Sequence, residues 1–196
     1  LTLTQTDFDL IREHYFLADP VILDGCYFRS MDCIFDEYID KYNKIKIEAK
    51  GAKRQIAKLF LNNLYGKMAT STDSSFKLCR VNDDNSLSYS TITKYDVKRG
   101  GYIPIGAAIT SYARNFTIRA AQKNYHGVDE PGFIYADTDS IHCDLPPDKL
   151  RGIKVDDNAF CCWKLESCWD EAVFIRQKTY AEHITMENLE PTEEPY

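Results

Sequence analysis

The feature that most constrains this chain is the segment 133–142, where two aspartates lie two positions apart between apolar runs. The aromatic and β-branched residues on either side favour strands, so the segment predicts a hairpin with Asp137 and Asp139 near its tip. Alternate side chains of an extended backbone point the same way, so both carboxylates are expected on one face. Close carboxylates either share a proton or hold a hard cation, and oxygen ligands suit Mg²⁺ or Mn²⁺ better than Zn²⁺.

Asp-Thr-Asp-Ser also has a simpler interpretation, because these residues favour turns and a D-x-D sequence on a loop is often only solvated. A second segment, 52–65, favours the functional interpretation. Apolar residues at helical spacing predict a helix there, with Gly66 as its C-terminal stop; they are Ile56, Leu59, Phe60 and Leu64.

One side of this expected helix carries Arg54, Lys58, Asn62 and Tyr65. The cations suit phosphates, the ring offers a stacking surface, and the amide can bond a base or sugar edge. The set therefore predicts a nucleotide-binding face, and a solvated basic face is the alternative.

The pattern Lys58-x-x-x-Asn62-x-x-Tyr65-Gly66, followed by Tyr135-x-Asp137-Thr138-Asp139-Ser140, resembles motifs B and C of the family B DNA polymerases. Lys178-Thr179-Tyr180 is similar to the K-x-Y motif that follows motif C in that family. Further stretches look like the protein-primed subgroup, the phage replicases that start from a terminal protein; they are 1–4, 24–25, 51–52, 64–67, 120–122 and 176–180.

The resemblance implies template-directed nucleotidyl transfer, in which a primer 3′-hydroxyl or a terminal-protein hydroxyl attacks the α-phosphate of a dNTP. Two Mg²⁺ (or Mn²⁺) ions would align the reactants and offset the developing charge. The implied catalytic metal ligands are Asp137 and Asp139, with Asp139 the first choice. The implied nucleotide-binding residues are Lys58, Asn62, Tyr65, Arg54 and Lys46, the last two facing the nucleotide or the terminal protein. The implied primer and template contacts are Tyr135, Thr110, Arg114, Lys178, Tyr180 and Gly66.

The expected fold class is α+β: an antiparallel palm sheet with packed helices, an antiparallel two-helix fingers segment and a β-hairpin insertion. The local patterns predict short strands in residues 1–29, including a hairpin at Asp24-Gly25. They also predict helices over 31–47, 52–65, 105–125 and 160–174, a hairpin around 82–85, a strand bearing 178–180 and a loose tail over 187–196. By resemblance, 1–29 are palm-proximal strands, 30–68 the fingers with motif B, and 102–196 the palm with motif C.

Residues 69–101 occupy the position of the insertion that the protein-primed subgroup uses for processivity and strand displacement, the second terminal-protein region. A surface hairpin without function is the alternative for this stretch. The family commonly has Asn-Ser where this chain has Asn62-Asn63. No stretch in residues 1–57 resembles motif A, D-x-x-S-L-Y-P, and the exonuclease and thumb are also missing. We therefore expect a C-terminal palm and fingers piece, inactive without the N-terminal palm and exonuclease part.

The net charge of −6 is unevenly distributed. Residues 41–67 sum to +7 and 68–128 to +4, whereas 1–40 sum to −7 and 129–196 to −10. A basic middle between acidic ends suits a DNA-facing surface next to a metal-binding surface.

The chain shows no signal peptide and no apolar run that would span a membrane. Its seven cysteines include no C-x-x-C pair, so a zinc site is not expected and reduced thiols are. With the resemblance, this places the protein in the cytoplasm of a bacterial host, encoded by a phage or prophage. Two other functions stay open: a non-catalytic remnant that binds DNA or terminal protein, and an unrelated D-x-D glycosyltransferase, which the helix motif and Lys178-Thr179-Tyr180 disfavour.

Overall fold

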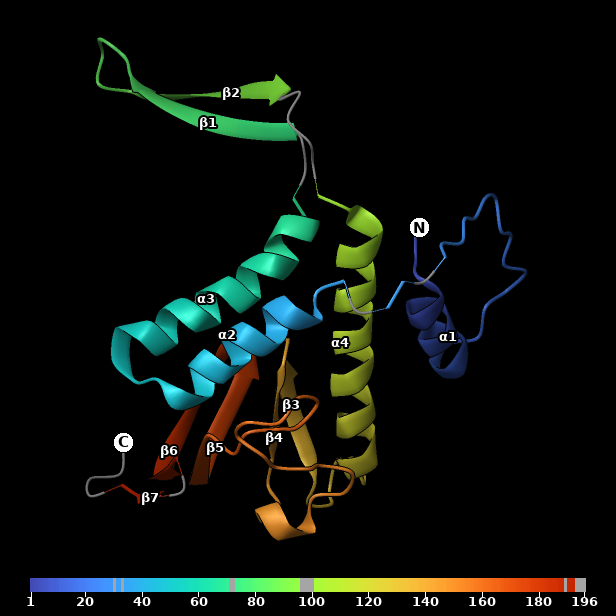
Figure 1. Ribbon diagram of the computed structural model, residues 1–196, viewed down its shortest axis with the longest axis vertical. Helices are drawn as coiled ribbons and strands as arrows, with labels where there is room; N and C mark the ends of the chain where they lie inside the picture. The colour runs from blue at the N-terminus through green and yellow to red at the C-terminus, as the bar shows by residue number, and fades with distance from the viewer. Residues whose placement is uncertain (30, 33, 71–72, 96–100, 189, 193–196) are drawn as a thin grey trace. The chain divides into compact units, whose positions relative to one another are not determined.

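Helices and antiparallel strand pairs alternate along the chain, which confirms the α+β class (Figure 1). The structure is a computed structural model that describes residues 1–196 apart from 30, 33, 71–72, 96–100, 189 and 193–196. It divides into two units, Leu1–Thr110 and Ser111–Tyr196. No helix in the described part of the chain is long and apolar enough to cross a membrane.

The first unit begins with helix α1 (Gln5–His14), so the strands expected in residues 1–29 are wrong. The local reason is a capping signal, because the Thr4 hydroxyl accepts a hydrogen bond from the Asp7 backbone N–H at 3.2 Å. Asp7 also places a negative charge in the first turn, where the helix dipole favours it. Leu10 is the buried residue of this helix.

The hairpin expected at Asp24-Gly25 is also wrong, because the described residues between 15 and 29 form no strand. The Asp24 carboxylate accepts a hydrogen bond from the Gly25 N–H at 2.7 Å, so the turn residues bond only locally. The apolar residues before the turn, Val21, Ile22 and Leu23, are all exposed. A two-stranded hairpin without a surface to pack on is marginal in water, so turn chemistry alone does not make strands.

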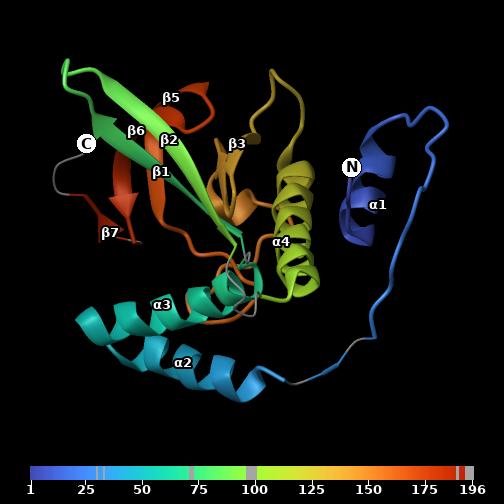
Figure 2. The same ribbon diagram turned by 90° about the horizontal axis from the view of Figure 1, so that it is seen from above.

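Helices α2 (Asp36–Glu48) and α3 (Gly51–Met68) lie side by side (Figures 1 and 2). The turn between them uses Gly51 in the left-handed region, at φ 59°. The rings of Tyr42 and Phe60 stack with centroids 4.8 Å apart, and the Tyr38 hydroxyl donates to the Phe60 carbonyl oxygen at 3.0 Å. Both expected helices are confirmed, although α2 begins five residues later than the pattern predicts.

Two details of the expected α3 are corrected. Gly66 lies inside the helix, which continues to Met68, where the Ala69 N–H bonds to the Tyr65 carbonyl oxygen. The buried residue of α3 is Ala57, whereas Ile56, Leu59 and Phe60 of the predicted apolar stripe are exposed. The predicted stripe is therefore largely exposed, although the ring of its Phe60 stacks on Tyr42 of α2.

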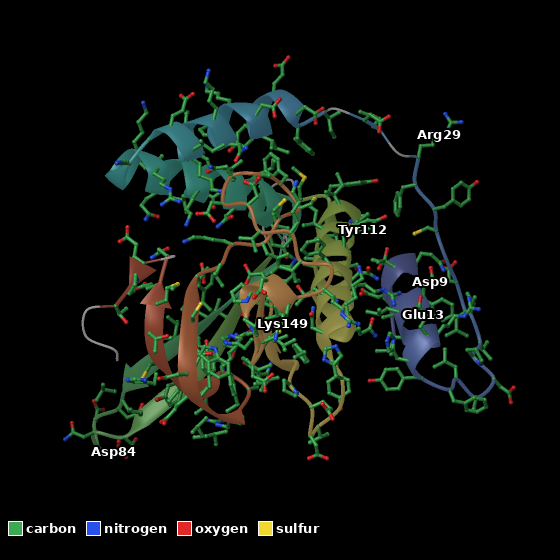
Figure 3. All side chains as sticks on the ribbon, turned by 90° about the horizontal axis from the view of Figure 1, so that it is seen from below. Asp9, Glu13, Arg29, Asp84, Tyr112 and Lys149 are labelled. Atoms are coloured by element: carbon green, nitrogen blue, oxygen red, sulfur yellow. The ribbon has the colours of Figure 1, made fainter. Side chains whose placement is uncertain are left out.

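Strands β1 (Asp73–Val81) and β2 (Leu87–Tyr95) form the hairpin expected between residues 69 and 101, in continuous antiparallel register. Its turn is ordered by side chains, since the Asp84 carboxylate accepts from the Ser86 N–H at 2.9 Å and from its hydroxyl at 2.6 Å. Asn85 has φ 63° there, which asparagine tolerates. Figure 3 shows Asp84 at the free end of the hairpin. Residues 71–72 and 96–100 of the expected insertion lie outside the described residues.

Helix α4 (Ile103–Asn124) confirms the expected helix over 105–125 and runs from the first unit into the second. In the second unit its C-terminal part lies beside the hairpin of β3 (Phe133–Asp137) and β4 (Ser140–Cys143) (Figures 1 and 2). The buried residues of this part are small or polar: Ser111, Thr117, Ala120, Ala121 and Asn124. The larger side chains of Tyr112 and Phe116 on the same helix are exposed.

A three-stranded antiparallel sheet, β5 (Ser167–Arg176), β6 (Thr179–Glu187) and β7 (Glu190–Pro191), completes the second unit after the 3-10 helix η1 (Pro147–Lys149). The helix expected over 160–174 is therefore wrong throughout: none of these residues is helical, and β5 begins at Ser167. Pairing with β6 overrides the helical spacing of the apolar residues, because strand preference depends strongly on the neighbouring strand. Part of the tail expected to be loose pairs as β7, and its last residues, 193–196, lie outside the described residues.

Candidate active site

The hairpin that carries the two aspartates has a two-residue turn. Asp137, the last residue of β3, pairs with Ser140, the first residue of β4, so Thr138 and Asp139 form the turn. Thr138 has φ 50°, in the left-handed region. The backbone between the aspartates is therefore not extended, and the expectation that one extended segment aligns both carboxylates is wrong. Asp137 is part of the strand, whereas Asp139 is exposed in the turn.

Hydrogen bonds fix this turn from three directions. The Thr117 hydroxyl on α4 donates to the Thr138 carbonyl oxygen at 3.2 Å. The Thr138 hydroxyl donates to Asp137 Oδ1 at 3.0 Å, and the Ser140 hydroxyl donates to the Asp137 carbonyl oxygen at 3.1 Å. Thr117 is a residue that sequence reasoning missed, because its role depends on the packing of α4 against the hairpin.

The turn between β5 and β6 brings Lys178 onto Asp137. The Lys178 ammonium nitrogen lies 2.7 Å from both carboxylate oxygens of Asp137. Bonding to Lys178, and then to the Thr138 hydroxyl, lowers the pKa of Asp137, while the same carboxylate raises the pKa of Lys178. Lys178 was expected on a strand; it is in the turn, at φ 59°, and β6 begins at Thr179.

The Tyr135 hydroxyl accepts a hydrogen bond from the Lys178 backbone N–H at 2.9 Å. The Tyr135 ring belongs to an aromatic cluster with His142, Phe174 and Tyr180, at centroid distances of 5.4, 5.5 and 5.4 Å. Tyr180 stacks on Phe174 and remains partly open to solvent. Three residues of the predicted site, Tyr135, Lys178 and Tyr180, are thus brought together next to Asp137.

Sequence reasoning also missed the pair formed by His142 on β4 and Glu182 on β6. His142 Nδ1 donates to Glu182 Oε1 at 2.6 Å, and the side chains are only 14% and 10% exposed. His142 lies on β4 of the aspartate hairpin, but its partner Glu182 is 40 residues away in sequence. No local pattern connects the two residues, so only the packed unit shows the pair.

The carboxylates of Asp137 and Asp139 are not equally available to bind a divalent cation. Asp139 is exposed and, among the described residues, no hydrogen bond or ion pair holds its carboxylate, so its oxygens suit Mg²⁺ or Mn²⁺. Both oxygens of Asp137 bond to Lys178 instead. The described residues contain no group of three or more His, Cys, Asp or Glu side chains that could hold a metal. The present residues therefore supply one available ligand.

Four of the five predicted nucleotide-binding residues lie on α3, and the fifth, Lys46, lies on α2. Arg54, Lys58 and Asn62 are exposed along α3, and Tyr65 is 38% exposed one turn further on. Lys46 is half-buried on α2. The helix thus confirms the spacing on which the prediction rests, whereas the contact each side chain makes with a ligand stays a prediction.

Thr110 and Arg114 occupy the middle of α4. The Thr110 hydroxyl donates within the helix, to Ala107 O at 2.9 Å and to Gly106 O at 3.2 Å. The exposed Arg114 guanidinium lies 3.5 Å from the Ser111 hydroxyl. Gly66 contributes its carbonyl oxygen to a bond from the Thr70 hydroxyl at 2.8 Å. These contacts leave Arg114 as the side chain of this group best able to reach a phosphate.

The family model for DNA polymerase type B, organellar and viral, matches residues 2–156, which include both the α3 motif and the aspartate hairpin. The chain belongs to the type B DNA polymerases. Its similarity to individual members extends beyond that match, through the turn that carries Lys178.

The DNA polymerase of Bacillus phage Nf is 39% identical over 192 residues, which cover 97% of this chain and 32% of the phage protein. A structure of phi29 DNA polymerase with primer-template DNA and incoming nucleotides covers 92% of this chain and 31% of that one, at 35% identity and a TM-score of 0.73. The phi29 polymerase bound to primer-template DNA gives a TM-score of 0.76. This type B polymerase chain therefore spans about a third of the length of its relatives.

Proposed function

We propose that this chain forms the fingers and motif C portion of a polymerase that transfers nucleotides from dNTPs to the 3′-hydroxyl of a DNA primer, as directed by a template. The observation that carries the proposal is the junction of Tyr135, Asp137 and Lys178, because it joins two separate motifs of the family at one place. The solved phi29 polymerase complexes with primer-template DNA and nucleotide substrates support the same ligands for this chain.

Each group has a chemical role in this proposal. Lys178 and Tyr180 hold the primer strand, with the cation facing a phosphate and Tyr135 flanking the primer end. Lys58 on α3 binds the triphosphate, while Asn62 and Tyr65 shape the pocket of the new base pair. Phosphoryl transfer requires little covalent work from the protein, so positioning and charge are what these residues supply.

Mg²⁺ or Mn²⁺, two ions in the complete enzyme, would align the attacking and leaving oxygens and offset the charge that develops between them. Of the residues present, Asp139 would hold such an ion, with Asp137 second to it while Lys178 bonds both its oxygens. Further carboxylates from the rest of a longer polymerase would complete the ligand set.

We further propose that initiation uses a terminal-protein hydroxyl in place of the primer end, in the replication of a phage or prophage in the cytoplasm of its bacterial host. The similarity to DNA polymerases of Bacillus phages supports this proposal. Arg54 and Lys46 would face the nucleotide or the terminal protein, Thr110, Arg114 and Gly66 would lie along the primer and template, and the β1–β2 hairpin would act in strand displacement.

The test uses two measurements. Fluorescence anisotropy with a labelled primer-template duplex measures DNA binding by the chain itself, by Lys178→Met and by the control Lys164→Met, whose lysine bonds Asn188. Primer extension is then measured in a chimaera in which this chain replaces the matching third of the phage Nf polymerase, beside the chimaera carrying Asp139→Asn.

We expect the chain to bind DNA, Lys178→Met to weaken that binding, and Lys164→Met to leave it unchanged. We expect the chimaera to extend the primer with Mg²⁺ and Asp139→Asn to abolish extension. DNA binding with an inactive but folded chimaera would favour the alternative, a non-catalytic DNA-binding remnant. Extension that survives in Asp139→Asn would refute the assignment of Asp139.

A further inference from the structure

Two histidine–carboxylate pairs connect the strands of the second unit, and they differ in their contact with water. His142 with Glu182 and His183 with Asp170 both have a nitrogen–oxygen distance of 2.6 Å. The side chains of the first pair are 14% and 10% exposed, whereas those of the second are 46% and 60% exposed. Removing a carboxylate from water is unfavourable unless a good donor bonds it, so the shielded pair needs an explanation.

The position of His142 supplies one. Its ring faces Tyr135 across the β3–β4 hairpin and packs edge-on against Phe174 and Tyr180, at centroid distances of 5.6 and 5.0 Å. The bond to Glu182 fixes the rotation of the imidazole ring about the bond that joins it to Cβ. Packing against flat rings alone does not fix this rotation. His142 is therefore the one member of this cluster whose orientation is set by a directional bond to a charged group.

Tyr135 transmits this orientation to the turn that carries Lys178. Its hydroxyl accepts from the Lys178 backbone N–H at 2.9 Å. Lys178 is in the left-handed backbone region, at φ 59°, which is unfavourable for a residue with a Cβ and needs support from outside the turn. The continuous path of contacts is thus Glu182, His142, Tyr135 and then the backbone of Lys178.

We infer that His142 and Glu182 are positioning residues, which hold the Tyr135 ring so that its hydroxyl supports the Lys178 turn and keeps the lysine beside Asp137, where the primer end would lie. The part that concerns the primer rests on the proposed function. The part that concerns the turn rests only on the contacts within this unit. Neither residue contacts a reacting group, so both act through Tyr135 and Lys178.

The decisive variant is His142→Phe, which keeps a ring of similar size and removes the donor to Glu182. The matched control is His183→Phe, which makes the same change in the exposed pair; His183 lies on β6, the strand that also carries Glu182. The primary measurement is hydrogen exchange of the Lys178 amide by NMR in the isolated chain, with the amides of the paired residues Val173 and Ala181 as an internal reference. Tyr135→Phe, which deletes only the hydroxyl, supplies the second half of a double-mutant cycle.

We expect His142→Phe to accelerate exchange at Lys178 by about tenfold relative to the reference amides, the size expected for loss of one hydrogen bond. His183→Phe should leave the exchange rate of the Lys178 amide unchanged relative to the reference amides. In a chain that already carries Tyr135→Phe, His142→Phe should accelerate that exchange little further. An unchanged Lys178 amide in His142→Phe, or an acceleration spread equally over Val173 and Ala181, would overturn the inference.

Two further measurements keep the inference separate from the proposed function. Binding of a primer-template duplex should weaken in His142→Phe but not further in a chain that already carries Lys178→Met. If the unaltered chain binds no DNA, the proposed function fails while the exchange result still decides the positioning role. If His142→Phe does not fold, Glu182→Gln takes its place. The amide oxygen of the new glutamine still accepts from His142, so hydrogen exchange at Lys178 should rise less than in Tyr135→Phe. A larger rise would contradict the inference.

Discussion

The Lys178 ammonium nitrogen lies 2.7 Å from both carboxylate oxygens of Asp137, although 41 residues separate the two in sequence. Lys178 comes from the β5–β6 turn and Asp137 from the end of β3, so two sheets meet at this ion pair. A consequence is that the two aspartates of the hairpin have different surroundings. Asp137 faces a cation of its own chain, whereas Asp139 remains exposed in the turn.

This ion pair predicts how Asp137 titrates. The free carboxyl group has a pKa of 3.8, and Lys178 lowers it in the folded chain. A lowered pKa means that the pair stabilises the fold above pH 3.8 and that this stabilisation is lost as pH falls through the lower, folded value. We expect Lys178→Met to raise the Asp137 pKa toward 3.8, measured from the carboxyl carbon shift by NMR.

The same pair has an alkaline limit. Asp137 raises the pKa of Lys178 above its ordinary 10.5, so the stabilisation is fully present below 10.5 and is lost as pH rises through the folded value. Lys164→Met is the control and should leave the titration of Asp137 unchanged. A carboxyl titration that is identical with and without Lys178 would show that the pair does not persist in solution.

The proposed contact of Lys58 with the triphosphate leads to a prediction about the KM for dNTP. If its ammonium bonds the triphosphate, Lys58→Ala should raise the KM for dNTP in the phage Nf chimaera by roughly tenfold or more, because a charge-assisted hydrogen bond contributes about 1.5–3 kcal/mol. The control is Lys44→Ala on α2, whose lysine is 73% exposed and lies 3.9 Å from Glu48. Equal KM values for the two variants would contradict a triphosphate contact for Lys58.

The burial of Ala57 on α3 leads to a prediction about stability. All residues of α2 and α3 are described, and Ala57 is the only one that is fully buried, at 1% exposure. Ala57→Leu should lower the free energy of unfolding by about 1–3 kcal/mol, because extra methylene groups do not fit at a fully buried position without displacing its neighbours. Thermal unfolding followed by circular dichroism measures this.

The matched change on the open side of α3 is Leu59→Ala, at a residue that is 59% exposed. It should alter the unfolding free energy by no more than about 0.5 kcal/mol. If Ala57→Leu is as mild as Leu59→Ala, Ala57 is not tightly buried in solution.

The buried side chain of Asn124 connects the end of α4 to Arg151 by hydrogen bonds. Its amide donates to Ala120 O at 2.9 Å and to Arg151 O at 3.1 Å, and its oxygen accepts from the Arg151 N–H at 2.8 Å. Asn124→Ala should lower the free energy of unfolding by about 2–4 kcal/mol, since each buried group left without a partner costs about 1–3 kcal/mol. Urea unfolding measures the change; the exposed neighbour Gln122→Ala should change it by less than about 0.5 kcal/mol.

Local signals in the sequence are sufficient to predict those helices and hairpins whose formation depends only on their own residues. The β1–β2 hairpin follows from two strand-forming runs around 82–85, and α3 and α4 follow from helical spacing. The signal for α1 was also present, as Thr4 three residues before Asp7, but the apolar residues that follow were interpreted as strands. Residues 160–174 failed for another reason, since helical spacing there competes with the pairing of β5 to β6.

The sequence by itself determined the two motifs, the aspartate hairpin and the side of α3 that carries the predicted site, because each depends on residues close to one another along the chain. The order of these motifs along the chain then indicated the family. Only the tertiary structure decided that Lys178 bonds Asp137 and that His142 bonds Glu182, across 41 and 40 residues. It also decided that the aspartates differ, since one ends a strand and the other lies in a turn. Such contacts depend on how separate sheets pack, and no local pattern of side chains specifies that packing.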